Sequence, residues 1–161
     1  MSSTTPEFAA EPLDRIVVER YEPDPRLPEA VIVDFDGTLA HMDRRGPYEF
    51  HRVGEDRVDP AVKRLVSLLA PSVKIVVLTG RDDSCEAESR AWLADNEVPF
   101  DELHMRAAGD RRSDARVKFE IFDTRLRSRF HVIAAIDDRN SVVEMWRRLG
   151  IKCLQAQDGD F

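Results

Sequence analysis

Reactive side chains follow three short apolar runs of this sequence: Asp34 and Asp36, then Thr79, then the pair Asp137 and Asp138. A carboxylate can act as a nucleophile or as a general acid and base. Carboxylates that lie close together repel one another, and a cation relieves that repulsion. Because the set offers hard oxygen ligands and neither histidine nor thiolate, it favours Mg²⁺.

The three apolar runs have the character of strands buried on both faces. They cover residues 31–33, 73–78 and 132–136, and they are continuous rather than alternating, as in a parallel sheet. Stretches with apolar residues at helical spacing lie between them. We therefore predict an α/β fold with a doubly wound parallel sheet, in which the reactive side chains share the edge where the strands end.

Helix-boundary signals support this alternation. Pro60 suits the first turn of a helix with Asp59 as its cap, and Gly150 suits the end of a helix over residues 141–149. Residues 41–59 are charged and show no clear periodicity. Further elements are expected in four stretches: helices over residues 83–96 and 114–127, and short strands at residues 103–105 and 153–154.

Length and composition bound the kind of protein. A chain of 161 residues fits one domain, and we predict a tail over residues 1–28, with a candidate edge strand at residues 15–21, before a folded domain over residues 29–161. No run of about 18 apolar residues occurs, and the first dozen residues lack a signal-peptide pattern. The chain has only two cysteines, which we interpret as reduced thiols. Together with these absences, the two thiols favour a cytoplasmic protein without a membrane partner. The net charge of −7 argues mildly against nucleic-acid binding.

One segment carries a recognisable signature. Residues 31–39 read VIVDFDGTL, with two carboxylates one residue apart and then Gly-Thr. This resembles the signature of the haloacid dehalogenase (HAD) superfamily of phosphatases. The remaining parts of that superfamily's set occur in the same order: Thr79, Lys118, Asp137 and Asp138.

The resemblance implies a role for each of these residues. Asp34 would be the nucleophile that forms an aspartyl-phosphate, and Asp36 would protonate the leaving oxygen and then activate water. Thr79 would bind phosphate oxygens, and Lys118 would offset the negative charge. Mg²⁺ would be the cofactor, held by the carboxylates of Asp34, Asp137 and Asp138 and by the backbone carbonyl of Asp36.

Plainer interpretations exist for some of these residues. Asp36 could be a turn residue, although the following Gly-Thr speaks against it. Lys118 could be an ordinary solvated helix residue, but Asp114 lies one helical turn before it and favours a function. Asp137 and Asp138 could cap the following helix, which is compatible with metal binding.

Further stretches narrow the resemblance. Residues 45–48 read RGPY, residues 135–150 read AIDDRNSVVEMWRRLG, residues 109–122 read GDRRSDARVKFEIF, and the chain ends in GDF. Together they resemble the phosphatase domain of phage polynucleotide kinase/3′-phosphatase enzymes over about residues 30–161. That resemblance implies hydrolysis of 3′-phosphates on DNA or RNA ends.

The same resemblance implies residues that hold the substrate. A guanidinium group binds phosphate oxygens in bidentate fashion, and an acidic residue would orient Lys118 or an arginine. The substrate-binding set expected on this basis is Arg45, Arg81, Arg106, Asp114 and Arg139.

Two absences and two alternatives complete the sequence-based prediction. No GxxxxGK[ST] loop occurs, so no kinase activity is expected. About 20 residues separate Thr38 from Pro60, too few for a cap domain, so an open site is expected. A phosphatase of nucleotide or sugar phosphates and an inactive binding module of the same fold are the alternatives, and a homodimer is a candidate assembly.

Overall fold

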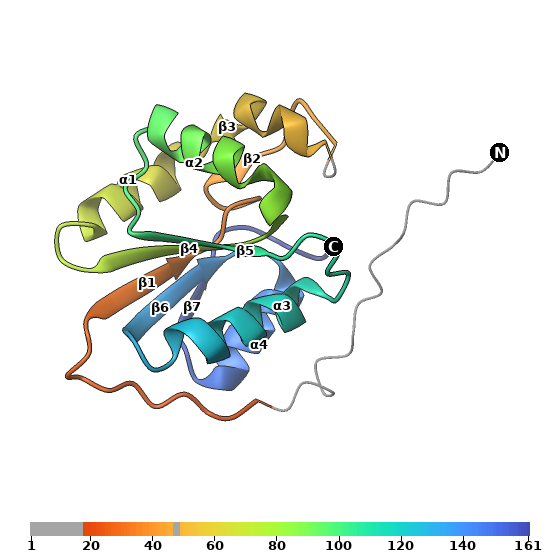
Figure 1. Cartoon of the computed structure of the whole chain (residues 1–161). Helices are drawn as coiled ribbons and strands as arrows, with labels where there is room; N and C mark the ends of the chain where they lie inside the picture. Colours follow the sequence, from red (N-terminus) through yellow and green to blue (C-terminus); the bar gives the residue numbers. More distant parts are fainter. Residues whose placement is uncertain (1–17, 47–48) are drawn as a thin grey trace.

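A five-stranded parallel sheet forms the centre of the protein. The computed structural model describes residues 18–46 and 49–161 (Figure 1). The strand order is β5-β4-β1-β6-β7, and each neighbouring pair is parallel. The strands are β1 (Glu29–Val33), β4 (Lys74–Asp82), β5 (Glu102–Arg106), β6 (His131–Asp137) and β7 (Cys153–Gln155).

Helices cover both faces of this sheet. Helices α1 (Pro60–Leu69) and α2 (Glu86–Asp95) pack on one face, and α3 (Asp114–Ile121) and α4 (Asn140–Leu149) pack on the other (Figure 1). Each face has its own apolar core, which contains Trp92 on one side and Trp146 on the other. The predicted doubly wound α/β fold is confirmed, and burial on both faces explains the continuous apolar runs.

Local signals in the sequence set the helix boundaries. The Asp59 side chain accepts hydrogen bonds from the N–H groups of Ala61 and Val62, both at 3.0 Å, so α1 begins at Pro60 as predicted. Helix α4 ends at Gly150, whose φ of 90° suits glycine. The predicted helix over residues 114–127 is α3 continued by the π-helix η4 (Phe122–Leu126).

Small elements fill the segment that showed no periodicity. Strands β2 (Ala40–His41) and β3 (Arg57–Val58) form an antiparallel ribbon, with the 3₁₀ helix η2 (Phe50–Glu55) between them. Trp92 on α2 donates a hydrogen bond from Nε1 to the carbonyl oxygen of Asp56 at 2.8 Å. Within the described part of this segment, the chain folds onto α2 and does not build a separate cap domain.

Two predicted strands differ from the structure. Strand β4 does not end before Thr79 but continues to Asp82, and its pairing with β5 shifts register between those two residues. The described part of the predicted edge strand, residues 18–21, is not a strand. The reason is that Tyr21 turns into the core, where its hydroxyl donates to the Phe130 carbonyl at 2.8 Å. Residues 15–17 of that prediction lie outside the described residues.

The helices are short. The 3₁₀ helix η3 (Asp83–Cys85) leads directly into α2, and the α-helices have between 8 and 10 residues. In the part of the chain that the structure describes, no helix has the length and apolarity needed to cross a membrane.

Candidate active site

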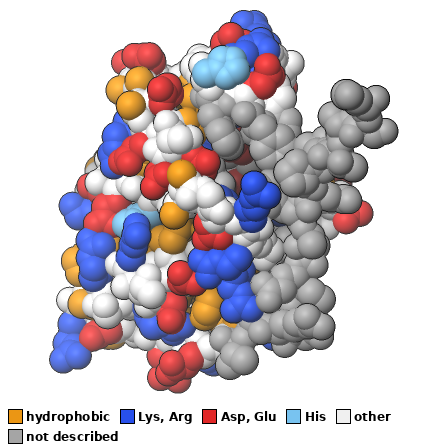
Figure 2. Space-filling model, turned by 45° about the vertical axis from the view of Figure 1, so that its right-hand side comes forward, with side chains coloured by type: hydrophobic (Ala, Val, Ile, Leu, Met, Phe, Trp, Pro, Cys, Tyr) orange, Lys and Arg blue, Asp and Glu red, His pale blue; other side chains and the backbone are white. Residues whose placement is uncertain are grey.

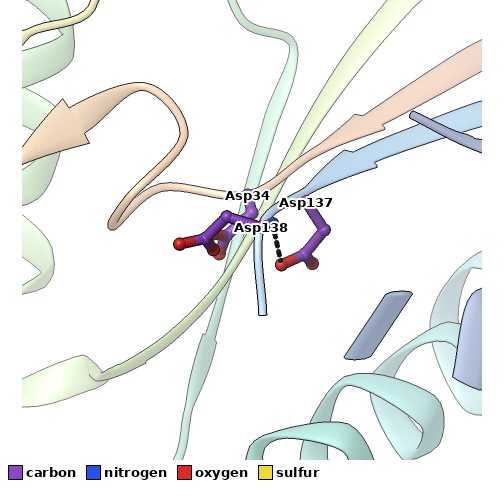
Figure 3. Close-up of side chains that lie close together, drawn as sticks. All are labelled: Asp34, Asp137 and Asp138. Atoms are coloured by element: carbon purple, nitrogen blue, oxygen red, sulfur yellow. Dashed lines mark hydrogen bonds between the residues drawn. The ribbon is translucent and has the colours of Figure 1, made fainter. Parts of the chain in front are cut away.

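The strand ends bring the predicted catalytic residues together. Asp34 follows β1, and its N–H donates to the carbonyl of Ile136 in the neighbouring strand β6 at 2.9 Å. Figure 3 shows the side chains of Asp34, Asp137 and Asp138 close together where these strands end. All three side chains are buried. The fold therefore gathers acidic groups at the edge that the sequence predicted.

Lys118 reaches this acidic group from α3. Its Nζ donates to Oδ1 of Asp34 at 2.7 Å and to Oδ2 of Asp137 at 2.9 Å, and Oδ2 of Asp114 lies 3.6 Å away. Its side chain is 1% exposed, so Lys118 is not a solvated helix residue. A buried lysine between carboxylates offsets part of their mutual repulsion.

The electrostatics show how strongly these groups interact. Burial, and next to it the charge of Asp137, raises the pKa of Asp34 well above its usual range, although Lys118 opposes this. Burial also raises the pKa of Asp137. Burial alone would lower the pKa of Lys118, but the carboxylates of Asp114, Asp137 and Asp34 raise it well above its usual range. One lysine thus does not fully compensate the acidic groups around it.

The acidic group fits a divalent cation. Oxygen atoms of Asp34, Asp137 and Asp138 all lie within 4.8 Å of one another. Lys118 pairs with Asp34 and Asp137, and Asp138 adds a third buried carboxylate, so a further positive charge would stabilise the cluster. Because every ligand atom offered is a carboxylate oxygen, the three side chains suit Mg²⁺.

The two aspartates at the end of β6 differ in their partners. Asp137 accepts at Oδ1 from the N–H of Asp138 at 2.9 Å, and at Oδ2 from Lys118 and from Trp146 Nε1 at 3.4 Å. Asp138 accepts at Oδ2 from Gln157 Nε2 at 3.4 Å, a long contact. Figure 3 shows the carboxylate of Asp137 turned away from the other two. Asp138 is therefore better placed to ligate a metal together with Asp34.

Thr38 and Thr79 border the nucleophile candidate. The Thr38 hydroxyl donates to Oδ2 of Asp34 at 3.2 Å. Thr79 is fully buried, and its hydroxyl oxygen accepts from the N–H of Arg81 at 3.1 Å. Because that oxygen accepts from the backbone, the hydroxyl proton of Thr79 can point toward a bound anion.

Asp36 belongs to a second charged group, which we call the arginine–aspartate network: Asp36, Asp56, Arg45 and Arg81. Arg81 donates from Nε to Oδ2 of Asp36 at 2.9 Å and from Nη2 to Oδ1 at 2.7 Å. The same Nη2 donates to Oδ2 of Asp56 at 2.7 Å. Arg45 donates to both oxygens of Asp56, at 2.7 and 2.8 Å, and lies 3.5 Å from Oδ1 of Asp36.

Asp56 was missed by the sequence analysis. Its side chain and that of Arg45 are 0% exposed, whereas Asp36 remains 25% exposed. Asp56 thus binds both arginines on the buried side of the network, while Asp36 is partly exposed to solvent. The RGPY stretch pointed to Arg45, but nothing nearby in the sequence marks Asp56, because its partners Arg45 and Arg81 lie 11 and 25 positions away.

Arg81 is fixed on several sides. Its guanidinium lies 3.8 Å above the centre of the Phe35 ring, and Nη1 donates to the Ser89 hydroxyl at 3.2 Å. Although burial opposes it, the ion pairs with Asp36 and Asp56 raise the pKa of Arg81. A guanidinium held in this way presents a fixed direction to the site.

The other predicted substrate-binding residues lie in different surroundings. Arg106 donates from Nε to the carbonyl of Gly80 at 2.9 Å, and from Nη1 to the carbonyls of Asp110 and Arg112. The first contact joins β5 to β4, and the other two hold the loop between β5 and α3. Direct substrate contact by Arg106 stays a prediction.

Asp114 lies between Gly80 and Lys118. Its Oδ1 is buried without a hydrogen-bond partner, and a Cβ atom on Gly80 would come within 2.2 Å of that oxygen. Burial alone would raise the pKa of Asp114, but Lys118, Arg139 and Arg106 lower it. Arg139, directly after Asp138, lies against the Phe161 ring at 5.0 Å.

The sequence matches a family model over most of its length. Residues 28–161 match the model described as the polynucleotide kinase PNKP phosphatase domain. A curated relative, a putative bifunctional polynucleotide kinase/RNA ligase of Autographa californica nuclear polyhedrosis virus, is 37% identical over 133 residues. That alignment covers 78% of this chain and 19% of the viral protein.

Solved structures agree with this match. A chain of the Pnkp1/Rnl/Hen1 complex superposes with a TM-score of 0.85 at 33% identity, covering 91% of this chain and 52% of its own length. A HAD-like hydrolase of Streptococcus pneumoniae (TM-score 0.55, 15% identity, covering 80% of this chain and 84% of its own) shows the same fold. A HAD family enzyme of Bacteroides thetaiotaomicron, solved with magnesium and inorganic phosphate, also shows this fold (TM-score 0.52, 12% identity, covering 83% of this chain and 96% of its own). The chain thus spans about half of one relative's length and a fifth of another's.

Proposed function

The chain belongs to the family of polynucleotide kinase PNKP phosphatase domains, and on that premise we propose that it is a Mg²⁺-dependent polynucleotide 3′-phosphatase. The observation that carries the proposal is the position of Asp34, which lies buried between Lys118, Thr38 and the acidic pair at the end of β6. A carboxylate confined by fixed groups on several sides is suited to attack a phosphorus atom in line.

The first step forms a covalent intermediate. An oxygen of Asp34 attacks the terminal phosphorus, the bond from phosphorus to the 3′ oxygen breaks, and an aspartyl-phosphate results. Asp36, two residues on and partly exposed, donates a proton to the departing 3′ oxygen, so that the polynucleotide leaves as an alcohol.

The second step restores the enzyme. Asp36, now ionised, accepts a proton from a water molecule, and that water attacks the phosphorus of the aspartyl-phosphate. The bond between Asp34 and phosphorus breaks, which releases inorganic phosphate and the free carboxylate. Thr79 and Arg81 would bind the phosphate oxygens in both steps.

The acidic group is the proposed metal site. Asp34 and Asp138 would hold Mg²⁺ by their side chains, and Asp36 would contribute its backbone carbonyl. The cation supplies positive charge next to the phosphate oxygens. Lys118 Nζ lies 2.9 Å from Oδ2 of Asp137, and this ion pair would orient Asp34, to which Lys118 also donates.

Two observations support a polymer end as the substrate. The described residues between Leu39 and Asp59 form only a short ribbon and a 3₁₀ helix of 6 residues, with no separate cap domain that would close over a small substrate. The relatives are named for polynucleotide kinase, RNA ligase and an RNA repair complex. We propose that this chain acts on DNA or RNA 3′ ends, through a phosphatase domain that spans residues 29–161.

A substrate panel tests the proposal. Phosphate release in Mg²⁺ is measured from a 3′-phosphorylated oligonucleotide, its 5′-phosphorylated counterpart, a free nucleotide and a sugar phosphate. We expect the 3′-phosphorylated oligonucleotide to have the highest kcat/KM. A preference for the nucleotide or sugar phosphate would replace this function with that of a small-molecule phosphatase, and inactivity on every ester would indicate a binding module.

A further inference from the structure

The C-terminal segment 155–161 borders the proposed metal site. Gln155 donates from Nε2 to the carbonyl of Asp138 at 2.8 Å, and Gln157 donates from Nε2 to the Asp138 carboxylate at 3.4 Å. The carbonyl of Gly159 accepts from the N–H of Asn140, the first residue of α4, at 2.8 Å. The segment is thus fixed to the loop that carries Asp138.

Gly159 makes the closest of these approaches. A Cβ atom at this position would lie 1.9 Å from the carbonyl oxygen of Asp138 and 2.7 Å from the Cα of Arg139. Since any side chain there would collide with backbone, glycine is required for the segment to run so near the site. The GDF sequence at residues 159–161 therefore has a structural meaning that the catalytic scheme does not use.

Two residues after Gly159, an aromatic side chain lies against Arg139, the residue that follows Asp138. Phe161 is 69% exposed, and the guanidinium carbon of Arg139 lies 5.0 Å from the centre of its ring. Among the described residues, the other exposed large apolar side chains are aliphatic: Met42, Leu65, Leu68, Ile133 and Leu154. Both tryptophans are buried in the core and cannot stack on a ligand.

We propose, on the basis of the 3′-phosphatase function, that Phe161 seated on Arg139 is a stacking surface for the nucleobase next to the terminal phosphate. Arg139 directly follows Asp138, and its charge also acts on Asp114, which lies 3.6 Å from Lys118, so the arginine lies near the proposed reaction centre. An aromatic ring accepts any base, because every base has a π-face, and a neighbouring arginine strengthens the contact. The site would thus bind a base without reading its identity.

The test compares two substrates that differ only in the base. One is a 3′-phosphorylated oligonucleotide, and the other carries the same phosphate on an abasic terminal residue. Phe161→Ala should raise KM for the first substrate about 5- to 150-fold, the range of one base–aromatic stack, with kcat unchanged. For the abasic substrate, KM should change less than about twofold, because no stack exists to lose. Phe161→Tyr, which keeps the ring, should restore the KM of the unaltered chain.

A matched control removes exposed apolar surface elsewhere. Leu68 on α1 is 58% exposed, and Leu68→Ala should leave both KM values unchanged. An equal effect of Phe161→Ala on both substrates, or no effect on either, would overturn the base site while leaving the 3′-phosphatase function intact. If the unaltered chain hydrolyses an aryl phosphate but no oligonucleotide, the proposed function is wrong and the base site falls with it.

Discussion

Arg81 donates two parallel hydrogen bonds to Asp36, from Nε to Oδ2 at 2.9 Å and from Nη2 to Oδ1 at 2.7 Å. The proposed acid–base residue is therefore paired with the arginine that we propose to bind phosphate. Since Nη2 also bonds to the buried Asp56, Arg81 can release Asp36 and still be anchored. We infer that an arriving phosphate takes the place of Asp36 at Nε and Nη2 of this guanidinium.

Arg81→Lys should separate charge from geometry at this position. A lysine keeps the positive charge but cannot bond to Asp36 in bidentate fashion and to Asp56 at once. We expect kcat/KM for a 3′-phosphorylated oligonucleotide to fall by about tenfold or more, as for the loss of one charged hydrogen bond. Steady-state kinetics check this prediction. Full activity of the lysine variant would show that catalysis does not need the paired hydrogen bonds of the guanidinium.

Asp56→Asn should weaken both folding and catalysis. The variant leaves Arg45 and Arg81 buried with one negative partner fewer, and breaking a buried ion pair costs about 3 kcal/mol or more of unfolding free energy. Urea unfolding measures this cost, and kcat/KM should fall because Arg81 loses its anchor.

The matched control for Asp56→Asn is Asp43→Asn. Asp43 pairs with Arg57 at 2.8 Å, but both side chains are more than half exposed. Such a surface pair contributes less than about 1 kcal/mol. Equal losses of stability in the two variants would contradict the structural role given to Asp56.

Gly80→Ala should disturb the site without changing any charge. The new Cβ would come within 2.2 Å of Asp114 Oδ1 and push this carboxylate away from Lys118. We expect a loss of about 1–3 kcal/mol, as for overpacked cores, together with lower kcat. Gly54→Ala is the control, because a Cβ there meets nothing within 4 Å. A Gly80 variant as stable and as active as the Gly54 variant would refute this.

Mg²⁺ should stabilise the protein through Asp34 and Asp138. At a concentration of 100 times Kd, a ligand that binds only the folded state adds about 2.7 kcal/mol, so Tm should rise when Mg²⁺ replaces EDTA. Asp138→Asn should remove most of that rise, whereas Asp158→Asn, at an exposed position of the C-terminal segment, should keep it. A Tm that does not respond to Mg²⁺ in the unaltered chain would argue against the metal site.

Local patterns made the main sheet and the acidic site predictable from the sequence. Buried strands read as apolar runs, and parallel strands necessarily bring Asp34 and Asp137 to one edge. Asp59 and Gly150 marked helix ends by their own chemistry.

Long-range pairing explains what the sequence did not reveal. Asp56 acts through arginines far away in the chain, and it lies in a segment without periodicity. The hydrogen bonds of Arg106 to the carbonyl of Gly80 in β4 and to that of Arg112 in the following loop were not foreseen either, because no local pattern predicts the path of that loop. The continuation of β4 past Thr79 likewise depends on its pairing with β5.

The most direct test of the account is phosphate release from a 3′-phosphorylated oligonucleotide in Mg²⁺, measured for the unaltered chain and for Asp34→Asn. Asparagine has nearly the size of aspartate but is a very poor nucleophile, so the fold should persist, as an unchanged circular dichroism spectrum would confirm. The account predicts release by the unaltered chain and none above background by the variant. Comparable release by both would contradict the aspartyl-phosphate mechanism.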